Sequence, residues 1–121
     1  MQDFRRLLVW QKAHALAVSV HELTRRWRRG DHTGLIGQVR RSSLSIPSNI
    51  AEGAGRASAK EFAKFVQIAI ASSSELEYQL EFARDIRAFT AQTHAVFANR
   101  VVEVRRMLFG LLKKLRSAPP S

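Results

Sequence analysis

Apolar residues recur every three or four positions through most of this chain, which is the spacing of one face of an α-helix. Four such stretches predict helices over residues 7–27, 35–54, 58–86 and 90–115. No stretch shows the apolar and polar alternation of a half-buried strand. The pattern therefore predicts an all-α protein.

Capping signals support the predicted helix boundaries. Residues 58–61 have the Ser-x-x-Glu spacing of a capping box, in which the serine hydroxyl accepts the backbone N–H of the glutamate. Thr90 is the predicted cap of the last helix. A turn is predicted over residues 30–34, where Asp31 or Thr33 would cap the second helix.

Two residues interrupt the helical pattern. Pro47 lies inside the second predicted helix, where it lacks an N–H and clashes with the carbonyl of Ser43, at a cost of about 3 kcal/mol. Either the helix is kinked at Pro47, which we expect, or two shorter helices meet there. Gly110 costs about 1 kcal/mol relative to alanine, which predicts a close approach to a neighbouring helix.

Four helices joined by short turns predict an antiparallel up-down-up-down four-helix bundle. The length of 121 residues suits one domain, which we place over residues 1–117. The Pro-rich end, residues 118–121, is expected to be a disordered tail. In such a bundle the first and fourth helices are neighbours.

The positive charge is concentrated in two parts of the chain. Twenty Lys and Arg residues, fifteen of them Arg, against ten Asp and Glu give a net charge of +10. Residues 1–41 carry +6, residues 42–90 carry −1 and residues 91–121 carry +5. Because the first and fourth helices are expected to be adjacent, their charges are predicted to merge into one basic surface.

An arginine-rich surface is typical of proteins that bind nucleic acid, because guanidinium binds phosphate bidentately and stacks on bases. No helix-turn-helix spacing, zinc site or aromatic strand motif supports base-specific recognition. A merely solvated helix surface and a membrane-bound basic helix are the alternatives. The candidate contacts to nucleic acid are Arg25, Arg26, Arg28, Arg29, Arg100, Arg105, Arg106, Lys113 and Lys114.

A second group of polar residues surrounds Pro47. Asn49, Glu52 and Arg56 follow one another at helical spacing and so share a face. They form either a satisfied polar strip on a kinked helix or a polar cluster that fixes helix register or a subunit contact. The candidate residues of this cluster are Arg40, Asn49, Glu52, Arg56, Glu75 and Gln79.

No group of residues predicts catalysis. The absence of cysteine excludes disulfides, Cys-based zinc sites and thiol chemistry. His14 and His21 would lie about 10 Å apart along a helix axis, too far to share a metal ion. We therefore expect a non-enzyme without metal or cofactor. No apolar run is long enough to cross a membrane, and we expect a cytoplasmic protein.

Several motifs together resemble one bacterial family of four-helix bundles, the proteins encoded by intervening sequences of 23S ribosomal RNA. The resemblance covers essentially the whole chain. It rests on Val9-Trp10-Gln11-Lys12-Ala13-His14, Gln38-Val39-Arg40-Arg41, Ser45-Ile46-Pro47-Ser48-Asn49-Ile50-Ala51-Glu52-Gly53, Lys60-Glu61-Phe62, Glu75-Leu76-Glu77 and Gly110-Leu111.

The resemblance implies a cytosolic bundle that assembles into a ring-like homopentamer. It also implies kinship with the basic accessory proteins of diversity-generating retroelements, which are similar pentamers that bind nucleic acid and a reverse transcriptase. No catalytic residues come with it. The chain departs from the family pattern over residues 85–90, and its last helix has a single acidic residue, Glu103. A pentamer of this member would carry about +50.

These observations favour a non-enzymatic oligomer that binds RNA or DNA through its arginine-rich surface. The alternative is a protein-binding adaptor or scaffold for an acidic partner or a nucleic-acid enzyme. Self-association is expected separately, because Phe4, Trp10 and a wide apolar stripe exceed what a four-helix core must bury.

Overall fold

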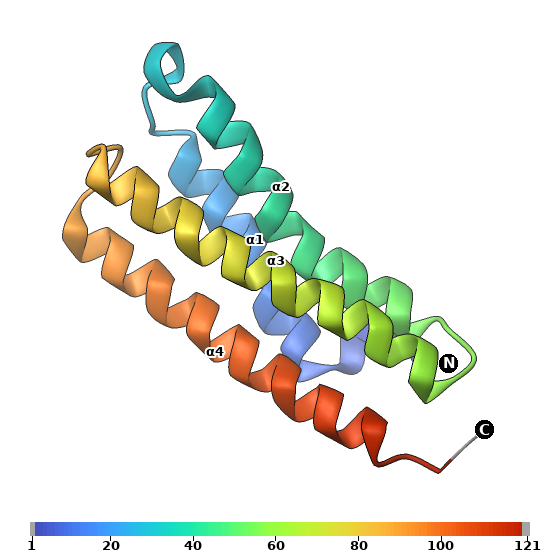
Figure 1. Cartoon of the computed structure of the whole chain (residues 1–121). Coiled ribbons are helices and arrows are strands. Elements are labelled where there is room, and N and C mark those ends of the chain that lie inside the picture. The colour runs from blue at the N-terminus through green and yellow to red at the C-terminus, as the bar shows by residue number, and fades with distance from the viewer. Residues whose placement is uncertain (1, 120–121) are drawn as a thin grey trace.

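A computed structural model describes residues 2–119 and contains four long helices. They are α1 (Leu8–Thr24), α2 (Arg29–Ala54), α3 (Ala59–Asp85) and α4 (Ala91–Arg116), preceded by a short 3-10 helix, η1 (Phe4–Arg6). Each helix packs antiparallel against the next, and α1 closes the bundle against α4 (Figure 1). The predicted all-α, up-down-up-down bundle is confirmed.

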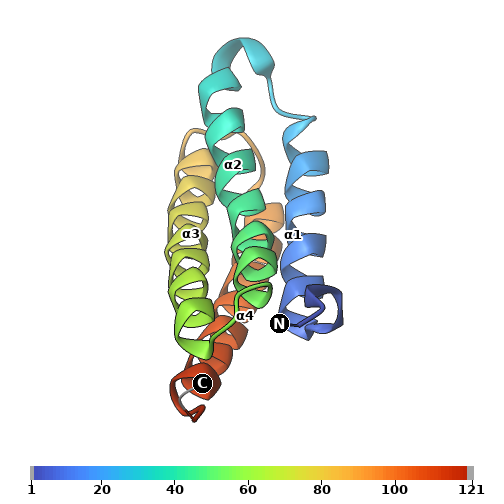
Figure 2. The ribbon, with the colours of Figure 1, turned by 90° about the vertical axis from the view of Figure 1, so that its right-hand side faces the viewer.

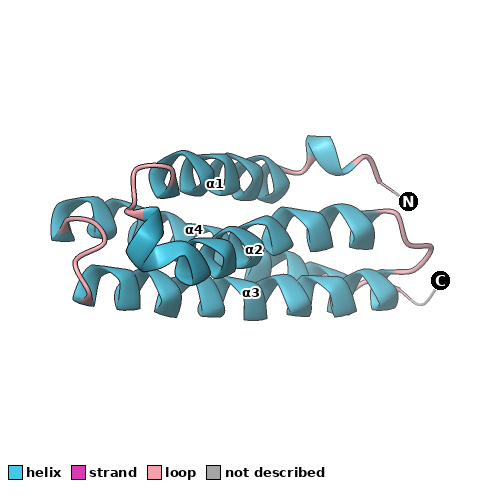
Figure 3. Cartoon of the chain, turned by 90° about the horizontal axis from the view of Figure 1, so that it is seen from above, coloured by secondary structure: helices cyan, strands magenta, loops and turns pink. Residues whose placement is uncertain are grey.

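The helices lie side by side along one long axis (Figure 2). The described part of the chain contains no strand, and its connecting turns gather at the two ends of the bundle (Figure 3). The end with the α2–α3 turn also holds both termini, whereas the α1–α2 and α3–α4 turns share the other end (Figure 1). The predicted tail, residues 118–121, lies partly outside the described residues.

Two of the predicted caps are present. Ser58 Oγ accepts the backbone N–H of Glu61 at 3.1 Å, and Thr90 Oγ1 accepts that of Thr93 at 3.1 Å. Each hydroxyl satisfies one of the N–H groups that a first helical turn leaves without an acceptor. These two helix starts are therefore determined by local sequence.

Residues 30–34, which were predicted as a turn, fall within α2, which begins at Arg29, but the helix is interrupted among them by the non-helical dihedral angles of His32. The prediction therefore located a break in the helix but not the reversal of the chain. Thr33 donates its hydroxyl hydrogen bond to the carbonyl of Arg29, and Asp31 lies in the first turn, where negative charge is favourable. The chain instead reverses over residues 25–28. Trp27 anchors this turn, since the residue is only 4% exposed and its ring packs against Phe89 at a centroid distance of 5.2 Å.

The kink predicted at Pro47 is not confirmed. The non-helical dihedral angles inside α2 occur at His32, with φ −127° and ψ 15°. Pro47 is buried, and its neighbours Ile46 and Ile50 are fully buried in the core. Packing on both sides of the proline therefore holds the helix in one piece, although one N–H is missing from its hydrogen-bond ladder.

The core is one cluster of mainly aliphatic side chains between the four helices. Fully burying one such side chain stabilises the fold by about 1.5–3 kcal/mol. All four helices contribute, and the largest buried aliphatic residues are Leu16, Val20, Val39, Ile46, Ile50, Val66, Leu76, Leu80, Val101, Val104 and Leu108.

Gly53, and not Gly110, marks the close approach between helices. A Cβ on Gly53 would lie 2.7 Å from Phe62 Cδ1 and 2.8 Å from Phe65 Cβ, which are both on α3. A Cβ on Gly110 would meet nothing within 4 Å. The close approach predicted for Gly110 is therefore wrong within this chain, because that position faces outward. A residue with a Cβ at position 53 would force α2 and α3 apart at this end of their interface.

We predict that Gly53→Ala lowers the free energy of unfolding by about 1–3 kcal/mol, because α2 and α3 must separate to admit the methyl group. Gly110→Ala is the matched control and should raise the free energy by about 0.5–1 kcal/mol, through helix propensity alone. Urea denaturation followed by circular dichroism measures both values. A Gly53→Ala variant as stable as wild type would contradict the packing described here.

Candidate nucleic-acid interface

An open groove runs between α1 and α4. It consists of two adjoining cavities of about 310 and 610 Å³ that share Leu8, Lys12 and Glu103 in their linings. Arg100 lines the smaller cavity and Arg106 the larger one. The predicted adjacency of the first and fourth helices is thus confirmed, and basic residues from both helices line the groove.

The groove has a positive balance. Lys12, Arg100 and Arg106 line it with a single carboxylate, that of Glu103, whose Oε1 lies 3.4 Å from Lys12 Nζ. Both members of this ion pair are about half exposed, so the pair adds little stability and opens easily. Lys12 was not among the residues predicted from sequence, because its role depends on the neighbouring helix.

The other predicted contacts extend this basic surface in both directions. Arg25 lies thirteen residues beyond Lys12, and one residue past the end of α1, about 20 Å further along the axis. Lys113 lies in the last turn of α4, toward the other end of the bundle. The exposed residues at the two ends are Arg25, Arg26, Arg28 and Arg29 at one and Lys113 and Lys114 at the other. Exposed cations therefore lie beyond the groove in both directions along the bundle, and we call the groove and these two ends the basic band.

Arg105 differs from the other predicted contacts. Its Nη1 donates to Glu77 Oε1 at 2.7 Å, which joins α4 to α3. The side chain is only 21% exposed. Arg106, the next residue, points about 100° away around the helix and lines the α1–α4 groove. Arg105 therefore stabilises the bundle, while Arg106 is available to a ligand.

Most of the basic side chains have no acidic partner. The described residues include every Lys, Arg, Asp and Glu of the sequence, and they form seven ion pairs with seven different cations and seven different carboxylates. Thirteen of the twenty cations and three of the ten carboxylates therefore lie outside these ion pairs. The formal charge of +10 is a surplus at the surface and is not neutralised internally.

The six residues predicted as one polar cluster fall into separate groups. Arg40 donates from Nε to Thr24 Oγ1 at 2.8 Å and from Nη2 to the carbonyl of His21 at 3.3 Å. It thus places a positive charge at the C-terminal end of α1, where the helix dipole favours it. Glu52 and Arg56 form an exposed ion pair at 3.1 Å on α2.

Gln79 and Asn49 belong to a seam of serines between α2 and α3. Ser42 donates to Gln79 Oε1, and the hydroxyls of Ser45 and Ser72 hydrogen-bond at 2.8 Å. Asn49 Nδ2 donates to the carbonyl of Ser45 at 2.8 Å. The sequence-based prediction omitted the three serines, although the i, i+3 spacing of Ser42 and Ser45 and the seven-residue spacing of Ser72 and Gln79 were the signals that could have found them.

Glu75 faces a polar recess of about 330 Å³, which it lines with Gln38, Arg41 and Gln79. Through Gln79 this recess adjoins the serine seam, but no ion pair joins Glu75 to the other predicted residues in the described part of the chain. The structure thus divides the predicted cluster between contacts that join two helices (Arg40 and Gln79), a bond within α2 (Asn49) and surface positions.

No metal centre is found among residues 2–119, since no three or more His, Asp and Glu side chains gather there in a way that could hold an ion. None of the described helices is both long and apolar enough to cross a membrane.

A family profile described as 23S rRNA-intervening sequence protein matches residues 5–110. The chain belongs to this family. The match begins before α1 and ends within α4, so it includes the serine seam, Gly53 and the α1–α4 groove. The resemblance seen in the sequence motifs is confirmed.

A solved structure has the same fold as this member of the 23S rRNA-intervening sequence proteins. It is a protein of unknown function from the S23 ribosomal protein family of Bacteroides thetaiotaomicron. The TM-score is 0.78 at 23% identity, over 88% of this chain and 99% of that one. None of the curated proteins matches this chain.

We predict that Arg105→Gln and Arg106→Gln have different effects on stability, although they remove the same charge from adjacent positions. Arg105→Gln should lower the free energy of unfolding by about 1 kcal/mol, because the half-buried Glu77 loses its partner. Arg106→Gln should change it by less than about 0.5 kcal/mol. Thermal denaturation at equal ionic strength measures both, and equal effects would contradict the structural role of Arg105.

Proposed function

We propose that this chain is a non-enzymatic, self-associating cytoplasmic protein that binds RNA or DNA along its α1–α4 face. The observation that carries this proposal is the excess of cations over carboxylates at the α1–α2 turn, in the groove and in the last turn of α4, which remains after Arg25, Arg28 and Lys12 have formed ion pairs. A row of this kind matches the regularly spaced phosphates of a nucleic-acid backbone better than it matches a single small anion.

Binding by such a surface rests on phosphate contacts. Arg106 and Lys113 are seven residues apart on α4 and therefore share a face, about 10 Å from each other along the axis. Arg100 lines the groove beside Lys12 and lies with its guanidinium 5.5 Å from the centre of the Phe97 ring. Such contacts fix a strand without reading its bases, so we expect affinity with little sequence preference.

The expected binding is strongly salt-dependent. If about five phosphates are neutralised per protomer, the association constant for single-stranded nucleic acid should fall roughly hundredfold between 50 and 200 mM salt. Arg106→Gln should lessen the slope of log K against log[salt] by about one unit. Fluorescence anisotropy with labelled single-stranded RNA and DNA oligonucleotides measures both quantities.

The matched control is Arg41→Gln, which removes one exposed, unpaired arginine from α2, away from the α1–α4 face. It should leave the slope within error of wild type. Absence of any binding by the wild type at about 50 mM salt would overturn the proposal. A protein partner that stays bound after nuclease treatment, without such binding, would favour the adaptor function instead.

Self-association is supported by apolar side chains that the bundle leaves exposed on α3. Tyr78 and Phe82 are one helical turn apart and are 65% and 44% exposed, and Ile86 continues the stripe just past the helix. Phe4 and Trp10, which were expected to carry this role, are half-buried against the core and pack on each other at 4.9 Å. The α3 stripe is therefore the better candidate for a contact with a second copy.

We predict that the wild type is an oligomer at about 10 µM and that Phe82→Glu shifts it toward the monomer, because a charge would be buried in the contact. Val96→Glu places the same charge at an isolated exposed apolar position on α4 and should not change the mass. Size-exclusion chromatography with light scattering measures the masses. A monomeric wild type, or equal effects of the two substitutions, would contradict an interface on the α3 stripe.

A further inference from the structure

An open groove of about 220 Å³ lies between α1 and α2. Its lining consists of His14, Ala17, Val18, His21, Arg40, Ser43 and Leu44. Val18 on α1 and Leu44 on α2 are its large apolar side chains, and they are 50% and 60% exposed. Exposed apolar side chains beside a hollow are typical of a surface that contacts another protein.

The α1–α2 groove has a positive character. Arg40 lines it from α2 and forms no ion pair within residues 2–119, and no carboxylate is part of the lining. His14 and His21 line it from α1, seven residues and about 10 Å apart along the helix axis. Each imidazole can donate a hydrogen bond. The groove therefore suits an apolar surface that carries carboxylates beside it.

The α3 stripe is a surface of this kind. Glu75 and Glu81 lie three residues before and after Tyr78, and both are exposed beside the stripe. Neither belongs to the seven ion pairs of the described residues, although thirteen cations also lie outside those pairs. Glu75 shares a recess with Arg41 but forms no ion pair with it. Two carboxylates beside an apolar stripe are thus available to a positively charged partner surface.

The charges of the groove and of the stripe lie at matching heights along the bundle. Ser42 on α2 donates to Gln79 on α3, and this bond fixes the relative height of the two helices. Arg40 and Glu81 are each two residues from it, toward the end that holds the α1–α2 and α3–α4 turns (Figure 1). Two bundles placed side by side in the same orientation can therefore bring Glu81 of one copy to the level of Arg40 of the other.

The second carboxylate matches the groove as well. Glu75 lies six residues before Glu81, about 9 Å toward the opposite end of the bundle. On α1, His14 lies about 10 Å in the same direction from His21, whose carbonyl accepts a hydrogen bond from Arg40 Nη2 at 3.3 Å. The spacing of the two carboxylates is therefore close to the spacing of the polar groups at the two ends of the groove.

A single chain cannot bring these two surfaces together. Among residues 2–119, α1 and α3 are not in contact, and they lie on different sides of α2 (Figure 2). The groove of one copy can therefore meet only the stripe of another copy.

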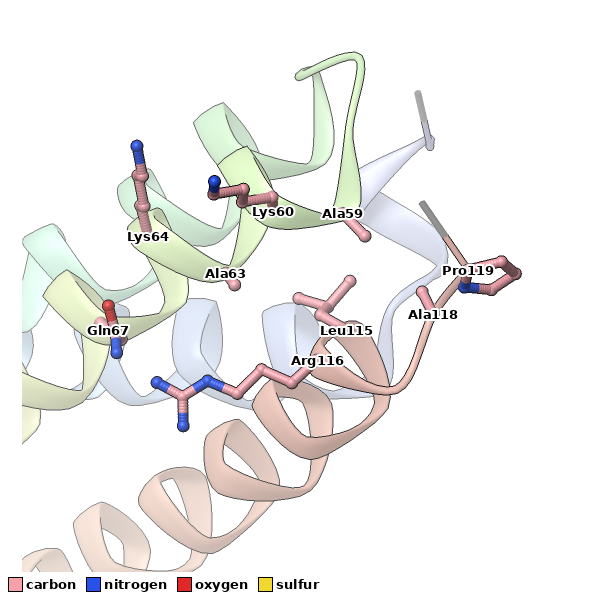
Figure 4. A pocket seen from close by; sticks show the side chains of 9 residues that line it. All are labelled: Ala59, Lys60, Ala63, Lys64, Gln67, Leu115, Arg116, Ala118 and Pro119. Atoms are coloured by element: carbon pink, nitrogen blue, oxygen red, sulfur yellow. The ribbon is translucent and has the colours of Figure 1, made fainter. Parts of the chain in front are cut away.

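A second hollow, of about 410 Å³ between the start of α3 and the end of α4, suits the stripe less well. The ammonium groups of Lys60 and Lys64 point out of it and away from Arg116 (Figure 4). Gln67, the α3 residue of its lining that is nearest to the stripe in sequence, lies about 16 Å along the axis from Tyr78. Two copies would have to shift along the bundle by about this distance to place the stripe there.

We infer that the α3 stripe of one copy docks in the α1–α2 groove of a second copy, with Tyr78 beside Leu44 and Glu81 beside Arg40. The inference rests on the self-association in the proposed function and names the surface that the stripe contacts. Because the two surfaces differ, the contact is heterologous, and each protomer offers one groove and one stripe.

The test uses full-chain variants that each block one surface. Leu44→Glu places a negative charge in the groove, where it repels the carboxylates beside the stripe, and Phe82→Arg places a positive charge on the stripe, where Arg40 repels it. Val96→Glu and Val96→Arg put the same charges at an exposed position on α4 and are the matched controls. Size-exclusion chromatography with light scattering measures the masses, and circular dichroism checks that each variant stays helical.

We expect each blocked variant to be a monomer at a concentration where the wild type and both controls are oligomers. An equimolar mixture of the two blocked variants should form a particle of twice the protomer mass. This pair can form because Leu44→Glu keeps an intact stripe and Phe82→Arg keeps an intact groove. It cannot grow, because its remaining groove and stripe are both blocked. These results would support the inference.

A crosslinking experiment tests the same contact without blocking it. The natural chain has no cysteine, so oxidation of a mixture of Leu44→Cys and Tyr78→Cys proteins should give mainly the mixed disulfide dimer. A mixture of Val96→Cys and Tyr78→Cys is the control. It should give little mixed dimer, because a disulfide needs Cβ atoms that are about 4 Å apart.

Other outcomes separate this inference from the proposed function. If Leu44→Glu is as oligomeric as the wild type and Tyr78→Cys forms disulfide dimers with itself, the stripe contacts another stripe. The inference is then overturned, while self-association stands. Blocked variants that stay monomeric when mixed, without a mixed disulfide in the crosslinking experiment, would also overturn it. A monomeric wild type would overturn both the inference and self-association, whereas oligonucleotide anisotropy tests nucleic-acid binding independently.

Discussion

The close packing of α2 against α3 is the constraint on which the bundle depends. Gly53 gives α3 room at one end of this interface, where a methyl group would lie within 2.8 Å of two phenylalanine side chains. Further along, Ser42 and Ser45 bond across to Gln79 and Ser72. Small side chains let two helices approach, and hydrogen bonds between them are satisfied at one register only. The α2–α3 pair therefore sets the frame to which the outer helices are added.

The position of the basic surface follows from the way in which α1 and α4 are attached to the α2–α3 pair. Arg40 fastens the end of α1 to α2, and Arg105 fastens α4 to α3, so each outer helix is held by the central pair. Among residues 2–119 the ion pair between α1 and α4 is the exposed one of Lys12 and Glu103, and a groove stays open there. The cations that line this open groove are in contact with solvent, so the folded chain does not have to supply a carboxylate partner for each of them. The basic band therefore lies beside the helix interface that contains an open groove and is joined by an exposed ion pair.

The sequence correctly predicted the features that depend on residues close to one another in the chain, namely the helices and two of their caps. Helical spacing gave the four helices, and the Ser58 and Thr90 caps depend on residues within one turn. It could not separate Gly53 from Gly110, because a glycine in a helix acquires its role from the surface opposite. The same limit applied to Arg105 and Arg106, which differ only in the 100° between adjacent helix positions. Likewise, of the six polar residues predicted as one cluster, Arg40 and Gln79 bond to a neighbouring helix, whereas Asn49, Glu52 and Arg56 bond within α2.

Assembly and nucleic-acid binding would be physically coupled in such a protein. Thirteen cations without partners repel one another within a protomer, and an oligomer brings several such sets together. The apolar α3 stripe must outweigh this repulsion, which salt screens and a polyanion removes. A ligand that binds the assembled state more tightly than the protomer shifts the equilibrium toward assembly by that difference in affinity. A strand lying along the basic band of several subunits would be such a ligand, so an oligomer formed weakly by the protein alone would be stabilised by the nucleic acid that it binds.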